Sequence, residues 1–334
     1  MEPHRRRIQV LGLAITAALL GCSTTESDGP EGPPGPRARS MTIPLEAAPE
    51  STPFSFLFGG HLYGDPGVVS AVPSPTLIAQ ALAIRTGPDA FLVSGGDLVR
   101  APRPEFLVAT REVLRFLDKP VFHVPGNHDH HGEDYESVFG PRFGAFSRGP
   151  ALFVLVDTEA VPWHFGSDQL AFLARQTEWA LARAECEHVV FFSHRVVFAA
   201  EDPRYACLLR NCNGRDGFDG SSNYDEDVVP LLRRLVDAGK HVLWFAGDVG
   251  VSWSFSAFFD RHPDQGVVYV AAGLGSTPRD ILVRVHVDRG AEPRCELVSL
   301  ANGATVATGE PLDQPIEHYG PEFWSREFAL RGDR

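Results

Sequence analysis

Alternating strands and helices predict an α/β protein with largely parallel sheets. Short apolar runs separated by amphipathic segments are typical of strand–helix–strand units, whose strands run parallel. Seven such runs indicate strands: Phe54–Phe58, Ala90–Ser94, Val121–Val124, Leu152–Asp157, His188–Ser193, His241–Ala246 and Val267–Ala271.

Four segments between these strands have apolar residues at the three- and four-residue spacing of a helix. They are Pro75–Arg85, Pro104–Leu117, Asp168–Ala184 and Asp225–Ala238. Ser74 is the expected N-cap of the first helix, with Pro75 at its first position, and Ser167 is the expected N-cap of the third.

The composition indicates a folded protein that does not bind nucleic acid. The chain has 334 residues, of which 43% are apolar and 23 are phenylalanine, so we expect one large domain with an aromatic core. The formal net charge of −13 argues against nucleic-acid binding, because neutralising phosphates requires clustered lysine and arginine.

The N-terminus has the pattern of a bacterial export signal. Three arginines precede the apolar run Ile8–Leu20, which at about 13 residues is too short to span a bilayer. "LLGC" at 19–22 resembles a lipobox, which implies cleavage after Gly21 and lipid on Cys22; an ordinary secretory signal is the alternative. The expected parts are therefore a signal peptide (1–21), a Pro/Gly/Ser-rich tether (22–52), a folded α/β domain (53–308) and an aromatic tail that docks on it (309–334).

This location in the cell envelope bears on the cysteines. Cys186, Cys207, Cys212 and Cys295 are even in number, which suits two disulfides in an oxidising compartment. Cys207 and Cys212 are close in the long loop 201–224 and would pair locally, leaving Cys186 with Cys295. Four unpaired thiols are the alternative.

Polar side chains follow five of the predicted strands. In open α/β sheets, ligands bind beyond the carboxyl ends of the strands, so these side chains are expected to meet. Imidazole, carboxylate and amide oxygen together suit zinc, iron or manganese. The residues are His61, Asp97, the run Asn127-His128-Asp129, His194 and Asp248.

The order of these motifs over about residues 54–300 resembles the calcineurin-like metallophosphoesterases. The matching motifs are Gly96-Asp97, Gly126-Asn127-His128-Asp129 and the lone His194. The resemblance implies a four-layer α/β/β/α sandwich, with two mixed β-sheets flanked by helices and a dinuclear metal site at one edge. It also implies hydrolysis of phosphate esters.

Two departures from the family pattern fall on one of the two metals. Gly59 stands where the first motif has an aspartate, and Gly250 stands where the last motif has its second histidine. When the family's ligands are carried over to this sequence, that metal keeps only His61 and the bridging Asp97. Asp65, four residues after His61, is a weaker candidate for a replacement ligand. The other metal keeps four ligands: Asp97, Asn127, His194 and Asp248, the last in place of a histidine. We therefore expect one divalent ion (Mn, Fe or Zn), with a weak second site left open.

The remaining site residues have provisional roles. His128 is expected to protonate the leaving group, oriented by Asp129. Arg195 is expected either to hold a phosphate oxygen or to form a salt bridge. The protein is then either a hydrolase of phosphorylated small molecules or other esters, or a non-catalytic lipoprotein that binds a metal or ligand. The long loop 201–224 serves either function as a lid or a partner surface.

Overall fold

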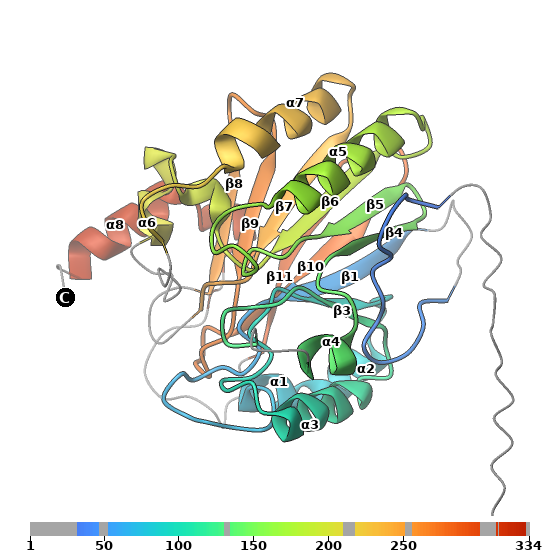
Figure 1. Cartoon of the computed structure of the whole chain (residues 1–334). Helices are drawn as coiled ribbons and strands as arrows, with labels where there is room; N and C mark the ends of the chain where they lie inside the picture. Colours follow the sequence, from blue (N-terminus) through green and yellow to red (C-terminus); the bar gives the residue numbers. More distant parts are fainter. Residues whose placement is uncertain are drawn as a thin grey trace, which may run out of the picture. The chain divides into compact units, whose positions relative to one another are not determined.

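Two β-sheets pack face to face in the computed structural model, which describes residues 32–46, 53–129, 134–209, 218–250, 256–300, 312 and 314–331 (Figure 1). The first sheet has the order β11-β10-β1-β2-β3. Its strands are β1 (Phe54–Gly59), β2 (Leu92–Ser94), β3 (Val121–His123), β10 (Ile281–Val287) and β11 (Arg294–Ser299). The second sheet has the order β4-β5-β6-β7-β9-β8. Its strands are β4 (Gly144–Arg148), β5 (Ala151–Leu155), β6 (His188–Ser193), β7 (His241–Ala246), β8 (Ala257–Arg261) and β9 (Val268–Ala272).

Both sheets are mixed. Strands β1, β2 and β3 run parallel, as do β5, β6, β7 and β9, whereas β10, β11, β4 and β8 add antiparallel edges. The sequence predicted the parallel strands, with bounds that differ by up to two residues, and missed these four. Of the missed strands, β10 has an alternating burial pattern, so the period of two was present in "ILVRVHV".

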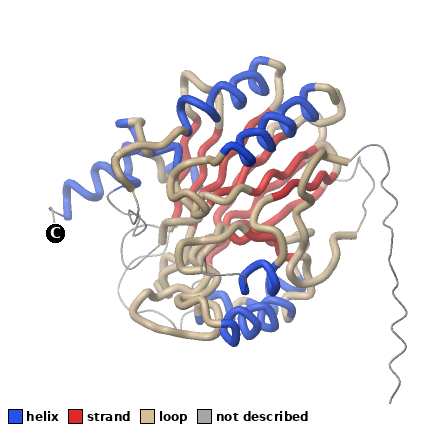
Figure 2. The backbone as a smooth tube through the Cα atoms, in the orientation of Figure 1, coloured by secondary structure: helices blue, strands red, loops and turns tan. Residues whose placement is uncertain are grey.

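Helices cover both outer faces, as the backbone trace shows (Figure 2). On the first sheet lie α1 (Pro75–Ala79), α2 (Ala81–Thr86), α3 (Pro104–Arg115) and α4 (Asp134–Phe139). On the second sheet lie α5 (Ser167–Leu181) and α7 (Val229–Asp237), and α6 (Ala206–Leu209) and α8 (Pro321–Arg331) pack near β8. The four layers are those of the expected α/β/β/α sandwich.

Phenylalanine fills the space between the sheets. Phe56 of β1 stacks on Phe91 at 5.1 Å and meets Phe153 of β5 edge-on at 5.4 Å. Phe58 packs against Phe245 of β7 at 4.9 Å. Such pairs contribute about 0.5–1.5 kcal/mol beyond the apolar area that they bury. The aromatic core therefore fixes the two sheets, and with them the strand ends that form the site.

Three of the predicted helices differ in the structure, at their starts or along their length. Ser74 makes no capping hydrogen bond; its hydroxyl instead contacts Thr76 and Asp280. The predicted helix Pro75–Arg85 divides at Gln80 into α1 and α2. Ser167 lies inside α5, whose N-cap is Gly166. The predicted helix Asp225–Ala238 begins with a π-turn at Tyr224–Val228 before α7.

The tether prediction is wrong for residues 34–41. Ala38 N donates to Ala145 O, Ala145 N donates to Pro36 O, and Met41 N donates to Val121 O, at 2.8–3.1 Å. Met41 is buried. This segment therefore packs along β4 and the start of β3 because its backbone finds partners there; residues 22–31 and 47–52 of the predicted tether, Cys22 included, lie outside the described residues.

The proposed Cys186–Cys295 disulfide is also wrong. Both are free thiols. Cys186 packs in the core between the second sheet and its helices, whereas Cys295 is on β11 and packs in the core between the sheets. The two residues thus lie in different layers. Cys212 lies outside the described residues, so its pairing with Cys207 stays a prediction.

In the predicted tail, Trp324 of α8 is fully buried and its indole N–H donates to Ala257 O at 2.9 Å.

No helix within the described part of the chain is both long and apolar enough to cross a membrane.

Candidate active site

The predicted ligands from both sheets meet at the carboxyl ends of the parallel strands. His61 follows β1, Asp97 follows β2, Asn127 follows β3, His194 follows β6 and Asp248 follows β7. His194 Nε2 lies 3.1 Å from Asn127 Oδ1, 3.5 Å from Asp97 Oδ1 and 3.8 Å from Asp248 Oδ1. The second oxygen of Asp97 lies 3.6 Å from His61 Nε2. Asp97 thus stands between two imidazoles, one on each side.

Glycines allow the two sheets to approach at this edge. A Cβ on Gly247 would lie 2.1 Å from the carbonyl oxygen of Gly95, and one on Gly95 would lie 2.8 Å from Gly247 Cα. Such contacts exclude any side chain at either position. The glycines before Asp97 and Asp248 therefore let the exits of β2 and β7 touch, which brings the two aspartates to one site.

Backbone carbonyls orient the two histidines. His61 Nδ1 lies 2.9 Å from Leu274 O, and His194 Nδ1 lies 2.8 Å from Gly95 O. A carbonyl can only accept, so each Nδ1 carries the proton and each Nε2 presents its lone pair toward Asp97. This second contact of a ligating imidazole is usual in protein metal sites.

The backbone at His61 and Asp97 is held in the left-handed region, with φ of 53° and 57°. Non-glycine residues seldom adopt it, and the cost is about 1–3 kcal/mol at each position. His61 N donates to Gly96 O at 2.9 Å, and Tyr63 N donates to Asp97 O at 3.1 Å. These bonds between the two loops hold both side chains inward despite the strain.

The buried site has neutral imidazoles and an excess of negative charge. Burial lowers the pKa of His61 to about 3, and burial together with Arg195 lowers the pKa of His194 well below its ordinary value. Burial, with the charges of Asp129 and Asp248, raises the pKa of Asp97 well above its ordinary value. Metal ligands must be deprotonated, so neutral imidazoles suit a bound cation, and a cation would offset the cost of keeping Asp97 ionised beside Asp129 and Asp248.

This donor chemistry fits a metal centred beside His194 Nε2. Within the described ranges, however, no group of three or more His, Cys, Asp or Glu side chains is already arranged to hold an ion. The donor set includes one amide oxygen, that of Asn127. His194 Nε2 lies 3.1–3.8 Å from the nearest oxygen of each of the other three residues. The residues that would hold the ion are Asp97, Asn127, His194 and Asp248.

The position beside His61 is incomplete, and the structure shows what stands in place of the missing ligands. A Cβ on Gly59 would lie 2.5 Å from Leu282 Cδ2, and one on Gly250 would lie 2.2 Å from the backbone of Gly273. Gly250 also has a φ of +95°. Asp65 does not repair the gap, because it is exposed and its carboxylate accepts from Gly67 N at 2.8 Å.

Arg195 is a buried salt-bridge partner and is not placed to hold a substrate. Its Nε and Nη2 donate to Glu159 at 2.7 and 2.8 Å, and its Nη1 lies 3.3 Å from Asp248 Oδ2. Burial opposes its charge, but Asp248 and Glu159 outweigh burial and raise the pKa of the guanidinium. The salt-bridge alternative for Arg195 is therefore correct, and its partner Glu159 was not predicted.

Asp129 and His128 also differ from their expected pairing. The Asp129 carboxylate is fully buried and accepts from Val99 N at 3.1 Å and Gly126 N at 3.0 Å, so it shapes the loop. His128 Nδ1 instead accepts from Arg100 Nη1 at 2.8 Å. A guanidinium only donates, so the proton of neutral His128 is on Nε2. Arg100 was not predicted as the partner of His128, although a cation three residues after Asp97 was a visible signal in the sequence.

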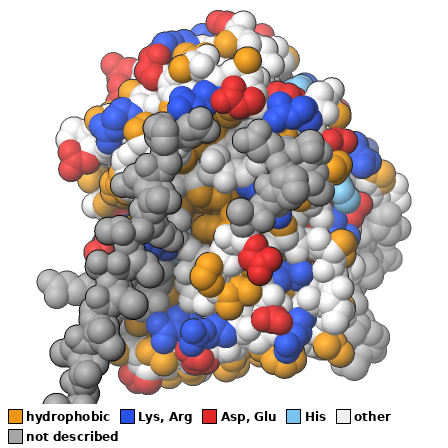
Figure 3. Space-filling view, turned by 90° about the vertical axis from the view of Figure 1, so that its right-hand side faces the viewer, with side chains coloured by type: hydrophobic (Ala, Val, Ile, Leu, Met, Phe, Trp, Pro, Cys, Tyr) orange, Lys and Arg blue, Asp and Glu red, His pale blue; other side chains and the backbone are white. Residues whose placement is uncertain are grey.

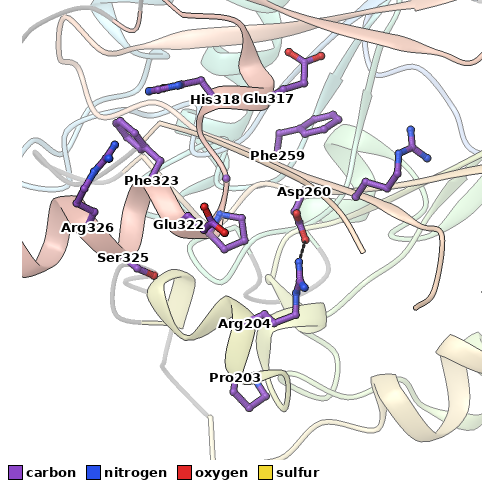
Figure 4. Close-up of a pocket in the computed structure, with 13 residues that line it drawn as sticks. Pro203, Arg204, Phe259, Asp260, Glu317, His318, Glu322, Phe323, Ser325 and Arg326 are labelled. Atoms are coloured by element: carbon purple, nitrogen blue, oxygen red, sulfur yellow. Dashed lines mark hydrogen bonds and ion pairs between the residues drawn. The ribbon is translucent and has the colours of Figure 1, made fainter. Parts of the chain in front are cut away.

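A large surface pocket lies elsewhere, between β8 and α8 (Figure 4). It encloses about 790 Å³, and Arg204 within it is paired with Asp260 at 2.9 Å. It contains none of the residues predicted to bind metal. Its size therefore does not mark it as the reaction centre.

Comparison with known proteins identifies the family of this chain. The sequence profile of the calcineurin-like phosphoesterases matches residues 73–249, more than half of the chain. The chain belongs to the calcineurin-like phosphoesterase family. The match spans β2 to β7 and therefore includes Asp97, Asn127, His194 and Asp248, although it begins after His61. Metal-dependent hydrolysis of phosphate esters is the chemistry of this family.

One curated protein and one solved structure are similar to parts of this chain. A stretch of 53 residues is 43% identical to glycerophosphodiester phosphodiesterase GpdQ of Enterobacter lignolyticus (strain SCF1), covering 16% of this chain and 19% of that protein. The fold is similar to that of purple acid phosphatase PPD1 from yellow lupin (Lupinus luteus). That similarity has a TM-score of 0.50 at 12% identity, and covers 80% of this chain and 58% of the lupin chain. The matched part of this chain thus covers less than two thirds of either protein.

Proposed function

We propose that this protein hydrolyses phosphate esters with one tightly held divalent cation. The observation that carries the proposal is the set of donors around His194 Nε2, which comes from both sheets and includes two carboxylates. A divalent cation there would supply polarisation of a phosphoryl oxygen and activation of water. His61 and Asp97 would make a second, weaker position.

The protein's own residues supply the rest of the chemistry. Arg100 holds His128 with its proton on Nε2, so that this nitrogen can donate a hydrogen bond to the leaving oxygen of an ester. Arg195 holds Asp248 in the site through an ion pair. GpdQ is named as a phosphodiesterase, which makes phosphodiesters the first substrates to test.

The test is metal analysis combined with turnover. The mature protein is loaded separately with manganese, iron or zinc, and hydrolysis of chromogenic phosphate mono- and diesters is measured. Near one bound ion per chain with turnover that Asp97→Asn abolishes supports the proposal. Turnover equal in wild type and Asp97→Asn would contradict it.

The second candidate is a non-catalytic lipoprotein that binds a metal or ligand. Gly250 favours it, because the close approach of Gly273 leaves no room for the second histidine of the last motif. One tightly bound ion without turnover on any phosphate ester would support this candidate.

We also propose that lipid on Cys22 anchors the domain to the bacterial cell envelope. The proposal depends on the basic start, the apolar run and "LLGC" in the sequence. Metabolic labelling with a fatty acid tests it: wild type should incorporate the label and Cys22→Ser should not.

A further inference from the structure

One buried side chain at the site has no explanation in the chemistry above. The hydroxyl of Tyr63 is buried and has no hydrogen-bond partner among the described residues. Tyr63 is 3% exposed, and its ring centroid lies 4.1 Å from that of His61. Buried polar atoms without a partner are rare, and they commonly mark a ligand or water that the protein binds.

Arg100 lies against the same tyrosine and is only partly used. Its Nε donates to Pro66 O at 3.0 Å, and its Nη1 donates to His128 Nδ1 at 2.8 Å. Its Cζ lies 6.0 Å from the Tyr63 ring centroid. Among the described residues, Arg100 Nη2 has no hydrogen-bond partner, and the side chain is partly exposed.

His128 completes the group. Its ring meets the edge of Tyr63 with centroids 5.3 Å apart, and Arg100 fixes its proton on Nε2. Arg100 and Tyr63 therefore bring a guanidinium and a phenol O–H together beside His61, and the His128 ring packs against both.

This corner coincides with the incomplete metal position. The glycines at 59 and 250 remove two of that position's four expected ligands, and Leu282 and Gly273 fill the space where side chains would project. Charge that a second cation would have placed on a bound phosphoryl group is therefore missing. Arg100 supplies a fixed positive charge nearby, and Arg195 cannot replace it because Glu159 and Asp248 already bind that side chain.

We infer that Arg100, Tyr63 and His128 form an oxyanion-binding cluster that takes tetrahedral anions, such as inorganic phosphate or the phosphoryl group of an ester, without a metal. The inference rests on the proposed function only in naming phosphate as the anion. Arg100 contacts the anion directly, His128 orients the guanidinium through its Nδ1, and Tyr63 packs against both side chains and satisfies its hydroxyl against the anion or its water.

The experiment measures binding of inorganic phosphate by calorimetry to the full mature protein, before and after treatment with a chelator. Phosphate should bind to the chelated protein. A charged hydrogen bond contributes about 1.5–3 kcal/mol, so Arg100→Gln should weaken binding by about 10- to 100-fold. Arg100→Lys, which keeps the charge, should retain part of the affinity, and Tyr63→Phe should weaken binding by a smaller factor.

The matched control is Arg103→Gln. Arg103 is exposed three residues further on and lies over the Phe106 ring, so its loss should leave phosphate affinity unchanged. Thermal unfolding of each variant checks that it folds. Loss of all phosphate binding on chelation, or equal affinity in Arg100→Gln and Arg103→Gln, would overturn the inference. Binding without turnover would uphold it and count against the hydrolase proposal alone.

Discussion

Replacing Arg195 distinguishes a structural role from a substrate-binding role for this residue. Arg195→Met keeps most of the side-chain volume but removes three contacts, two to Glu159 at 2.7–2.8 Å and one to Asp248 at 3.3 Å. All three residues are buried, so the two carboxylates are left without a cation. We therefore expect a large loss of stability.

The magnitude follows from the burial of the pair. Removing one partner of a buried ion pair costs about 3–5 kcal/mol, because the remaining charge is uncompensated. For a domain of this size, that loss lowers the melting temperature by about 6–10 °C. An exposed pair such as Arg85–Asp118 provides the comparison, since its loss costs about 0–1 kcal/mol.

The assay is urea unfolding of the metal-free protein, with Arg195→Met, Glu159→Gln and the double variant forming a cycle. The double variant should be more stable than the sum of the two single losses implies, because it removes cation and carboxylate together. If Arg195→Met unfolds like wild type and only raises KM for phosphate esters, Arg195 binds substrate and is not a structural ion-pair partner.

Three further predictions concern separate features. His194→Ala should reduce bound metal to background in elemental analysis, because His194 faces three other donors, whereas His286→Ala on β10 should retain the metal. Gly250→Ala should cost more than about 4 kcal/mol in urea unfolding, since its Cβ would meet Gly273; Gly239→Ala, also left-handed but in open space, should cost about 1–2 kcal/mol. His123 is buried against Tyr135 and Phe139, and burial lowers its pKa from 6.5 to about 4. Between pH 6.5 and 4 the unfolded chain therefore binds a proton at His123 that the folded protein does not. The free energy of unfolding keeps its full value above pH 6.5 and falls by up to about 3 kcal/mol as the pH drops to about 4. In His123→Gln, urea unfolding should show a smaller loss over the same pH range.

The face of the protein shown in Figure 3 gives no simple guide to the charge of a partner. The face turned toward the viewer in Figure 3 carries Lys and Arg interspersed with Asp and Glu in its described part. Neither sign dominates that face, so long-range attraction of an anionic substrate would depend on local groups such as Arg100. In the proposed function, recognition of a phosphate ester would therefore depend on the inferred anion cluster together with the donors around His194.

The sequence by itself determined the parallel strands and the polar residues that follow them. Apolar runs with a glycine or serine before His61, Asp97 and Asp248 are local signals, and the carboxyl ends of parallel strands are the place where such residues meet. Because these motifs are local in the sequence, their order also predicted the family and the four-layer α/β/β/α sandwich. The antiparallel strands β4, β8 and β11 lacked such a signal.

Only the tertiary structure decided which side chains pair. The roles of Arg195 and Asp129 depend on residues 36 positions away and on backbone N–H groups of another loop, and sequence spacing contains no such distances. The contact of Arg100 with His128 likewise joins the exits of β2 and β3. The glycines at 59 and 250 were visible as losses, but the reason that they cannot be restored is physical: Leu282 and the backbone of Gly273 already fill the space.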